Sequence, residues 1–146
     1  MCGLATLADD SGLVVDALDG RPGVLSARYA GESATDAENV ARLLGELSSV
    51  PMDKRTARFQ CVIAVAITGR EVATFTGFVE GAIAVAAKGA GGFGYDPVFV
   101  LSAPPFDGMT MAQLSPADKA KLSHRGMAAA KAAEWLQSLF PEPEYN

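Results

Sequence analysis

The clearest pattern of hydrophobic and polar positions is an alternation of period two over residues 58–68. Both faces of this segment are largely apolar, which predicts a central β-strand covered on two sides. Two further extended segments, 71–78 and 81–87, follow without an intervening helix and predict an antiparallel meander. The first face of the central strand comprises Phe59, Cys61, Ile63, Val65 and Ile67.

Helical spacing of apolar residues appears in the second quarter of the chain and at its end. Thr35 and Glu38 form a capping-box pattern, which predicts a helix that ends near Ser48. Pro116 at the first position after Ser115 predicts a short helix, and Ser123 is the expected N-cap of the last helix. The apolar stripe of the first helix is Val40, Leu43, Leu44 and Leu47, and that of the last is Ala128, Ala132, Trp135, Leu136 and Leu139.

Near the N-terminus, two apolar runs (4–8 and 13–15) flank the acidic segment Asp9-Asp10-Ser11-Gly12. We expect two short buried strands here. Each carboxylate must reach solvent, a donor or a cation, because an unpaired buried charge is costly. In extended backbone only one of the two can face a given site. The alternative is an acidic turn with Ser11 as a local cap.

The segment 89–99 combines four glycines with the aromatic pair Phe93 and Tyr95 and one carboxylate, and it leads into a short apolar strand. Glycine lets the backbone approach a ligand closely, Phe93 and Tyr95 offer flat faces, and Asp96 offers an acceptor. Pro97 restricts Asp96 to extended geometry. The combination suits a pocket for a planar, hydrogen-bonding heterocycle. A glycine-rich turn with two aromatic residues in the core is the alternative.

His124 and Arg125 fall in the first turn of the predicted last helix, with Lys119 and Lys121 just upstream. Cations at a helix N-terminus oppose the helix dipole, so the placement is unfavourable by itself. A bound anion or polar ligand would resolve the conflict. An incidental pair of surface residues remains the alternative.

The composition narrows the class of protein. A chain of 146 residues with 49% hydrophobic and 20% charged residues predicts one domain, residues 1–146. A net charge of −5 argues against a nucleic-acid polymer as partner. No apolar run approaches the roughly 20 residues of a membrane span, so no membrane association is expected. The lack of a signal-peptide pattern and only two cysteines predict a reducing cytoplasm.

Three motifs together resemble the inosine/xanthosine triphosphate pyrophosphatases, which hydrolyse non-standard purine nucleoside triphosphates. The motifs occur in the family's order, and the resemblance extends over about residues 4–139. They are Ala8-Asp9-Asp10-Ser11-Gly12-Leu13 followed by Ser26-Ala27-Arg28-Tyr29, Gly91-Gly92-Phe93-Gly94-Tyr95-Asp96-Pro97, and Ser123-His124-Arg125-Gly126.

The resemblance implies an α/β fold, with a mixed twisted sheet that contains an antiparallel meander and is flanked by helices. It also implies Mg²⁺-dependent cleavage of ITP, dITP or XTP to the monophosphate and pyrophosphate. On that pattern Asp10 binds the metal or activates water, Ser11 lies next to the substrate and Phe93 stacks on the purine. The other implied substrate contacts are Gly94, Tyr95, Asp96, Lys119, His124 and Arg125. A cluster of donors there favours a base with a 6-oxo group over adenine.

Members of that family begin with an upstream strand, a Ser/Thr-Gly-Asn loop with a lysine, and a helix carrying a glutamate. This sequence starts directly before the acidic segment and is expected to lack them. Two hypotheses follow: a nucleoside triphosphate pyrophosphatase, or a non-catalytic purine-nucleotide-binding or assembly module. Removing an edge strand and its covering helix uncovers apolar surface, so we expect a homodimer.

Overall fold

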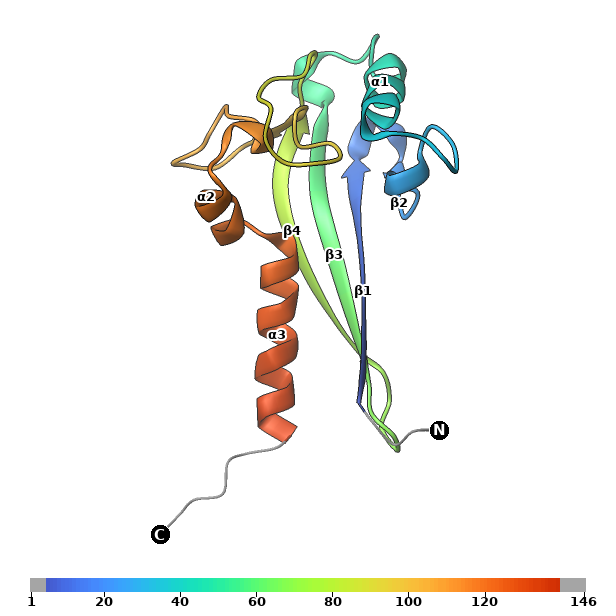
Figure 1. The fold of residues 1–146 in the computed structure, drawn as a ribbon, viewed down its shortest axis with the longest axis vertical. Helices are drawn as coiled ribbons and strands as arrows, with labels where there is room; N and C mark the ends of the chain where they lie inside the picture. Colours follow the sequence, from blue (N-terminus) through green and yellow to red (C-terminus); the bar gives the residue numbers. More distant parts are fainter. Residues whose placement is uncertain (1–4, 140–146) are drawn as a thin grey trace.

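Three long antiparallel strands form the body of the molecule in the computed structural model, which describes residues 5–139 (Figure 1). They belong to one sheet with the strand order β2-β1-β3-β4-β5, and all of its strand pairs are antiparallel. The α/β fold class is confirmed, and β3 is the central strand. The strands are β1 (Thr6–Val15), β2 (Pro22–Gly23), β3 (Thr56–Ala66), β4 (Ala73–Ile83) and β5 (Phe99–Leu101).

The acidic segment is part of one continuous strand, so the expected pair of short strands with a turn between them is wrong. All ten residues of β1 pair with β3, from Thr6 opposite Ala66 to Val15 opposite Ala57. The carboxylates at its exposed end reach solvent from the strand itself, which makes a turn unnecessary. Gly12 instead allows close approach of β2, because a Cβ atom there would lie 2.2 Å from the Gly23 carbonyl oxygen.

The expected third strand at 81–87 is also wrong, because β4 continues without a break to Ile83. Gly77 and Gly81 permit close packing within this strand. A Cβ atom at Gly77 would lie 2.1 Å from the carbonyl oxygen of His124, and one at Gly81 would lie 2.3 Å from that of Val100. The first turn of the last helix therefore packs directly on the β4 backbone.

The predicted helices are confirmed with their caps. Thr35 caps the first and forms a capping box with Glu38. Ser115 caps the second, with Pro116 at its first position. The Ser123 hydroxyl accepts a hydrogen bond from the Gly126 N–H at the start of the third. The expected stop at Pro141 lies outside the described residues, as do Cys2 and Leu4. The helices are α1 (Asp36–Glu46), α2 (Pro116–Lys121) and α3 (His124–Leu139), with short 3₁₀ helices η1 (Asp16–Leu18), η2 (Ser26–Arg28), η3 (Met52–Lys54) and η4 (Met111–Gln113).

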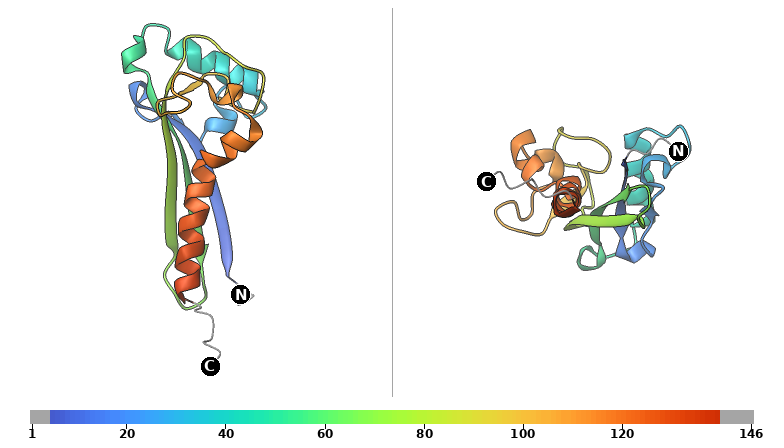
Figure 2. Two further views of the ribbon diagram at one scale, coloured as in Figure 1. Left: turned by 90° about the vertical axis from the view of Figure 1, so that its left-hand side faces the viewer. Right: turned by 90° about the horizontal axis from the view of Figure 1, so that it is seen from below.

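The helices pack on one face of the sheet only, so the expected cover on both faces of β3 is wrong within residues 5–139. Helix α3 runs along the strands, while α1 and α2 gather beside their upper end (Figure 2). Cys61, Ile63 and Val65 are buried against Ala128 and Ala132 of α3. The opposite face of β3, which includes Gln60 and Val62, is only partly buried.

A second and larger core lies at the upper end, where α1 and the loops meet the sheet. Leu43 and Leu47 of α1 are fully buried there, and Val40 and Leu44 pack at its margin, as the helical spacing predicted. None of the helices within residues 5–139 has the length and apolar character needed to cross a membrane.

Candidate functional site

A cavity of about 670 Å³ opens beside the upper end of the sheet, between the glycine-rich loop and the start of α3. Its volume lies in the range typical of small-molecule sites. Of the residues that the sequence singled out, Ser11, Phe93, Gly94, Tyr95, Asp96, Lys119, His124 and Arg125 all line it. Segments far apart in the sequence thus contribute to one cavity. The roles assigned to these residues stay predictions.

Asp96 organises the glycine-rich loop. The residue is only 3% exposed, and its Oδ2 accepts a hydrogen bond from the Phe93 N–H at 2.9 Å and forms an ion pair with Lys119 Nζ. Gly92 adopts a φ of +79°, and a Cβ atom there would lie 2.1 Å from Asp96 Oδ2. Glycine at position 92 is therefore required both by the backbone conformation and by the space that Asp96 occupies.

Phe93 extends from this loop with 66% of its surface exposed. Lys119 Nζ lies 4.5 Å from the centre of its ring, which is a cation–π distance. An exposed aromatic face beside a cavity is available for stacking on a planar ligand. Tyr95 is different, because its ring is buried and its hydroxyl donates to the Ser26 carbonyl oxygen at 2.8 Å. Burial raises the pKa of Tyr95, so this hydroxyl keeps its proton and its donor role.

His124 lines the cavity and contributes a polar atom that has no hydrogen-bond partner. Its ring stacks on Phe59, with centroids 5.4 Å apart and an angle of 15° between the planes. Its Nδ1 atom is buried and has no hydrogen-bond partner. Burial lowers the pKa of His124, and the neighbouring Arg125 lowers it further. The imidazole is therefore neutral at pH 7 and offers one donor and one acceptor.

Arg125 forms an ion pair with Asp9, with 2.9 Å between Nε and Oδ2. The neutral state of His124 and this ion pair together remove much of the conflict between the helix dipole and two cations at the start of α3. The electrostatic argument for a bound anion at this helix end is correspondingly weaker. The unpartnered His124 Nδ1 is the stronger indication of a ligand contact.

Asp10 does not line the main cavity. Side chains alternate along β1, so Asp9 and Ser11 face the α3 side of the sheet and Asp10 faces the other side. There Asp10 borders a small hollow of about 120 Å³ together with Gln60 and Val62. Ser11 contributes to the main cavity, and its hydroxyl is buried without a partner. Asp10 thus lies outside the lining of the main cavity, and its catalytic role stays a prediction.

The described residues contain no group of three or more His, Cys, Asp or Glu side chains that could hold a metal ion. Mg²⁺ is often bound by one or two carboxylates together with substrate phosphates. Asp9 is engaged by Arg125, and Asp10 lies on the other face of β1. The carboxylates of residues 5–139 therefore do not form a complete magnesium site by themselves.

The cavity lining includes residues that were not predicted as site residues, among them Asp36 and Asn39. Asp36 accepts a hydrogen bond from the Gly94 N–H at 2.6 Å, and Asn39 is 2% exposed and binds backbone groups near η2. Ser26 and Phe59 also line the wall. The only sequence signal was a polar Asn39 next to the apolar stripe of α1, since a polar residue at such a position needs partners.

The chain was compared with known proteins. A model of the Ham1 family matches residues 1–135. The dITP/XTP pyrophosphatase of Geobacillus kaustophilus is 59% identical over 133 residues, which cover 91% of this chain and 64% of that protein. The dITP/XTP pyrophosphatase of Geobacter sulfurreducens is 56% identical over 128 residues, which cover 88% of this chain and 63% of that protein. This chain thus spans less than two thirds of the length of either relative.

Solved structures agree with these matches. The Ham1 protein of Staphylococcus aureus aligns with a TM-score of 0.87 at 43% identity, over 94% of this chain and 69% of that one. The dITP/XTP pyrophosphatase of Mycobacterium abscessus aligns with a TM-score of 0.79 at 44% identity, over 92% of this chain and 67% of that one. The resemblance carried by the three motifs is therefore confirmed, and the chain belongs to the Ham1 family.

Proposed function

We propose that the chain hydrolyses non-standard purine nucleoside triphosphates (ITP, dITP and XTP) to the monophosphate and pyrophosphate with Mg²⁺. One observation carries the proposal: a single cavity gathers an exposed aromatic face, a fixed lysine and an unpartnered neutral histidine. The names of the two curated relatives, dITP/XTP pyrophosphatase, support the same substrate class.

Base selection follows from the geometry around Lys119. Its ammonium group is held by Asp96 and lies over the Phe93 ring. An ammonium group has three N–H donors, so donors remain for a ligand after the bond to Asp96. In the proposal Phe93 stacks on the purine and Lys119 donates to its 6-oxo oxygen. Adenine carries an amino group at that position, which would place a donor against a donor.

Mg²⁺ and a catalytic role for Asp10 are part of the proposal, and the activity assay addresses both. The described carboxylates do not form a complete metal site by themselves, so the geometry supports the base-binding part of the proposal more directly than the hydrolytic step. This same observation favours the second candidate function. In that case the chain is a purine-nucleotide-binding or assembly module without turnover.

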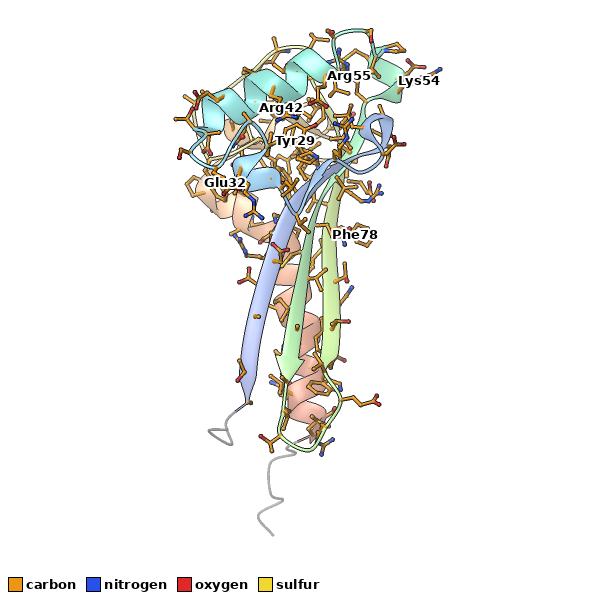
Figure 3. All side chains as sticks on the ribbon, turned by 90° about the vertical axis from the view of Figure 1, so that its right-hand side faces the viewer. Tyr29, Glu32, Arg42, Lys54, Arg55 and Phe78 are labelled. Carbon is orange, nitrogen blue, oxygen red and sulfur yellow. The ribbon has the colours of Figure 1, made fainter. Side chains whose placement is uncertain are left out.

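We also propose a cytoplasmic homodimer. The sheet face away from the helices carries apolar side chains, and Phe78 projects from β4 with 49% of its surface exposed (Figure 3). Val62 on the same face is only partly buried. Exposed apolar surface of this kind is typical of an interaction site, and a two-fold dimer is the simplest symmetric assembly.

The experiment that tests the proposal measures pyrophosphate released from ITP, XTP and ATP by the purified chain, with Mg²⁺ and with EDTA. We expect release from ITP and XTP that needs Mg²⁺ and is lost in Asp10→Asn. Asp53→Asn is the matched control, because Asp53 is an exposed carboxylate of η3 outside the cavity. Binding of IMP without any release would support the non-catalytic module and contradict the enzyme.

A further inference from the structure

Two carboxylates hold the consecutive backbone amides on either side of the Phe93 α-carbon. The N–H of Phe93 donates to Asp96 Oδ2 at 2.9 Å, which is a contact within the loop itself. The N–H of Gly94 donates to Asp36 Oδ2 at 2.6 Å, which reaches across to α1, 58 residues away in sequence. Asp36 therefore fixes the loop from outside at the residue next to the exposed aromatic ring.

The position of Asp36 in α1 leaves its side chain free for this contact. It follows the N-cap Thr35, whose capping box uses Glu38. Asp36 makes neither of the two hydrogen bonds of that cap. A carboxylate in the first helical turn is also favoured by the helix dipole, so the position suits an aspartate that binds a neighbouring loop.

Gly94, whose N–H binds Asp36, adopts a left-handed backbone conformation. Gly94 has a φ of +57°, yet a Cβ atom there would meet no atom within 4 Å. Space does not require glycine at this position, so the left-handed backbone is what requires it. The consecutive amides of Phe93 and Gly94 each donate to a separate carboxylate.

The same end of α1 also holds η2, whose Ser26 and Ala27 line the cavity. Asn39 accepts a hydrogen bond from the Ala30 N–H at 2.7 Å and donates to the Ala27 carbonyl oxygen at 3.1 Å. Tyr95 then links the glycine-rich loop to η2, since its hydroxyl donates to the Ser26 carbonyl oxygen. Helix α1 thus joins η2 and the glycine-rich loop into one frame around the cavity.

We propose that Asp36 is a positioning residue that sets the place of Phe93 in the base cavity. The inference rests on the proposed function, because its consequence is measured as nucleotide binding. Stacking contributes equally to the ground state and the transition state of a reaction at the phosphates. Loss of the hydrogen bond between the Gly94 N–H and Asp36 therefore weakens nucleotide binding and raises KM, and it leaves kcat within about twofold.

The test compares Asp36→Ala with Asp36→Asn. Asparagine keeps a carbonyl oxygen that can accept from the Gly94 N–H, but it loses the charge that favours the helix N-terminus. We expect Asp36→Ala to weaken IMP binding about three- to tenfold and to speed hydrogen exchange of the Gly94 amide by a similar factor. Asp36→Asn should restore both toward wild type. Calorimetry measures the binding, and NMR measures the exchange.

Three outcomes decide the inference separately from the proposed function. Equal losses in Asp36→Ala and Asp36→Asn would mean that the carboxylate acts only through helix stability, which overturns it. Faster Gly94 exchange with unchanged IMP affinity would make the contact merely structural and would overturn it as well. A wild-type chain that does not bind IMP would contradict the proposed function. Even then, an unchanged rate of Gly94 hydrogen exchange in Asp36→Ala would refute the positioning role of the Asp36 contact.

Discussion

At the scale of single residues, Asp96 determines the conformation of the glycine-rich loop. One of its oxygens is shared by a backbone amide of the loop and by Lys119 of α2. Because Asp96 is buried, losing either partner would leave a charge without compensation, which is costly. Glycine is required at position 92, because any side chain there would occupy the space of the Asp96 carboxylate.

Gly92→Ala and Gly69→Ala separate backbone strain from loss of the Asp96 contacts. The two glycines have nearly equal φ values, +79° and +81°, but a Cβ atom at Gly69 would meet nothing within 4 Å. We expect Gly69→Ala to lower the free energy of unfolding by about 1 kcal/mol through strain alone. Gly92→Ala should cost about 2 to 4 kcal/mol, because Asp96 must also move. Urea unfolding measures both, and equal costs would refute the role given to Asp96.

At the scale of elements, caps and helical spacing predicted the helices well, because both signals are local in sequence. Thr35, Ser115 and Ser123 all cap as expected. The strands were predicted less well, because their ends depend on partners distant in sequence. Gly81 was interpreted as a strand boundary, whereas it lies within β4 and allows close packing against β5.

Arg55 joins three elements and could not be recognised from the sequence. It is buried, and its guanidinium donates to the carbonyl oxygens of Leu47 after α1, Val50 before η3 and Ala84 after β4. A buried arginine normally has an acidic partner, but Arg55 forms no ion pair with any residue in 5–139. Carbonyl oxygens at the ends of several elements accept hydrogen bonds from its guanidinium group instead, and no local sequence pattern predicts these contacts.

Arg55→Met should therefore destabilise the whole fold. It removes the guanidinium donor from the carbonyl oxygens of Val50 and Ala84 and one of two donors from that of Leu47, so we expect the free energy of unfolding to fall by about 2 to 4 kcal/mol. Lys54→Met is the matched control, because Lys54 is the exposed neighbour at the same end of the molecule (Figure 3). The control should change stability by less than about 0.5 kcal/mol. Similar effects of the two substitutions in urea unfolding would contradict this account.

At the scale of the whole molecule, the sequence predicted eight residues of the main cavity but not those of α1 that hold the segments around it. Phe93, Lys119 and His124 were recognised because their motifs stand out in the chain. Asp36 and Asn39 were missed because both lie near the start of a helix, where a polar residue is readily explained by the helix itself. Which of Asp9 and Asp10 faces the cavity could not be read from the acidic segment alone, because it depends on the register and continuity of β1.

The central claim is that this cavity selects a purine with a 6-oxo group through Lys119. Binding of IMP and AMP by wild type, Lys119→Met and Lys121→Met tests it most directly. Lys121 is the control, an exposed lysine of the same helix paired with Asp118. We expect wild type and Lys121→Met to bind IMP at least about tenfold more tightly than AMP, and Lys119→Met to lose most of that preference. Equal binding of IMP and AMP by wild type, or an unchanged preference in Lys119→Met, would contradict the account.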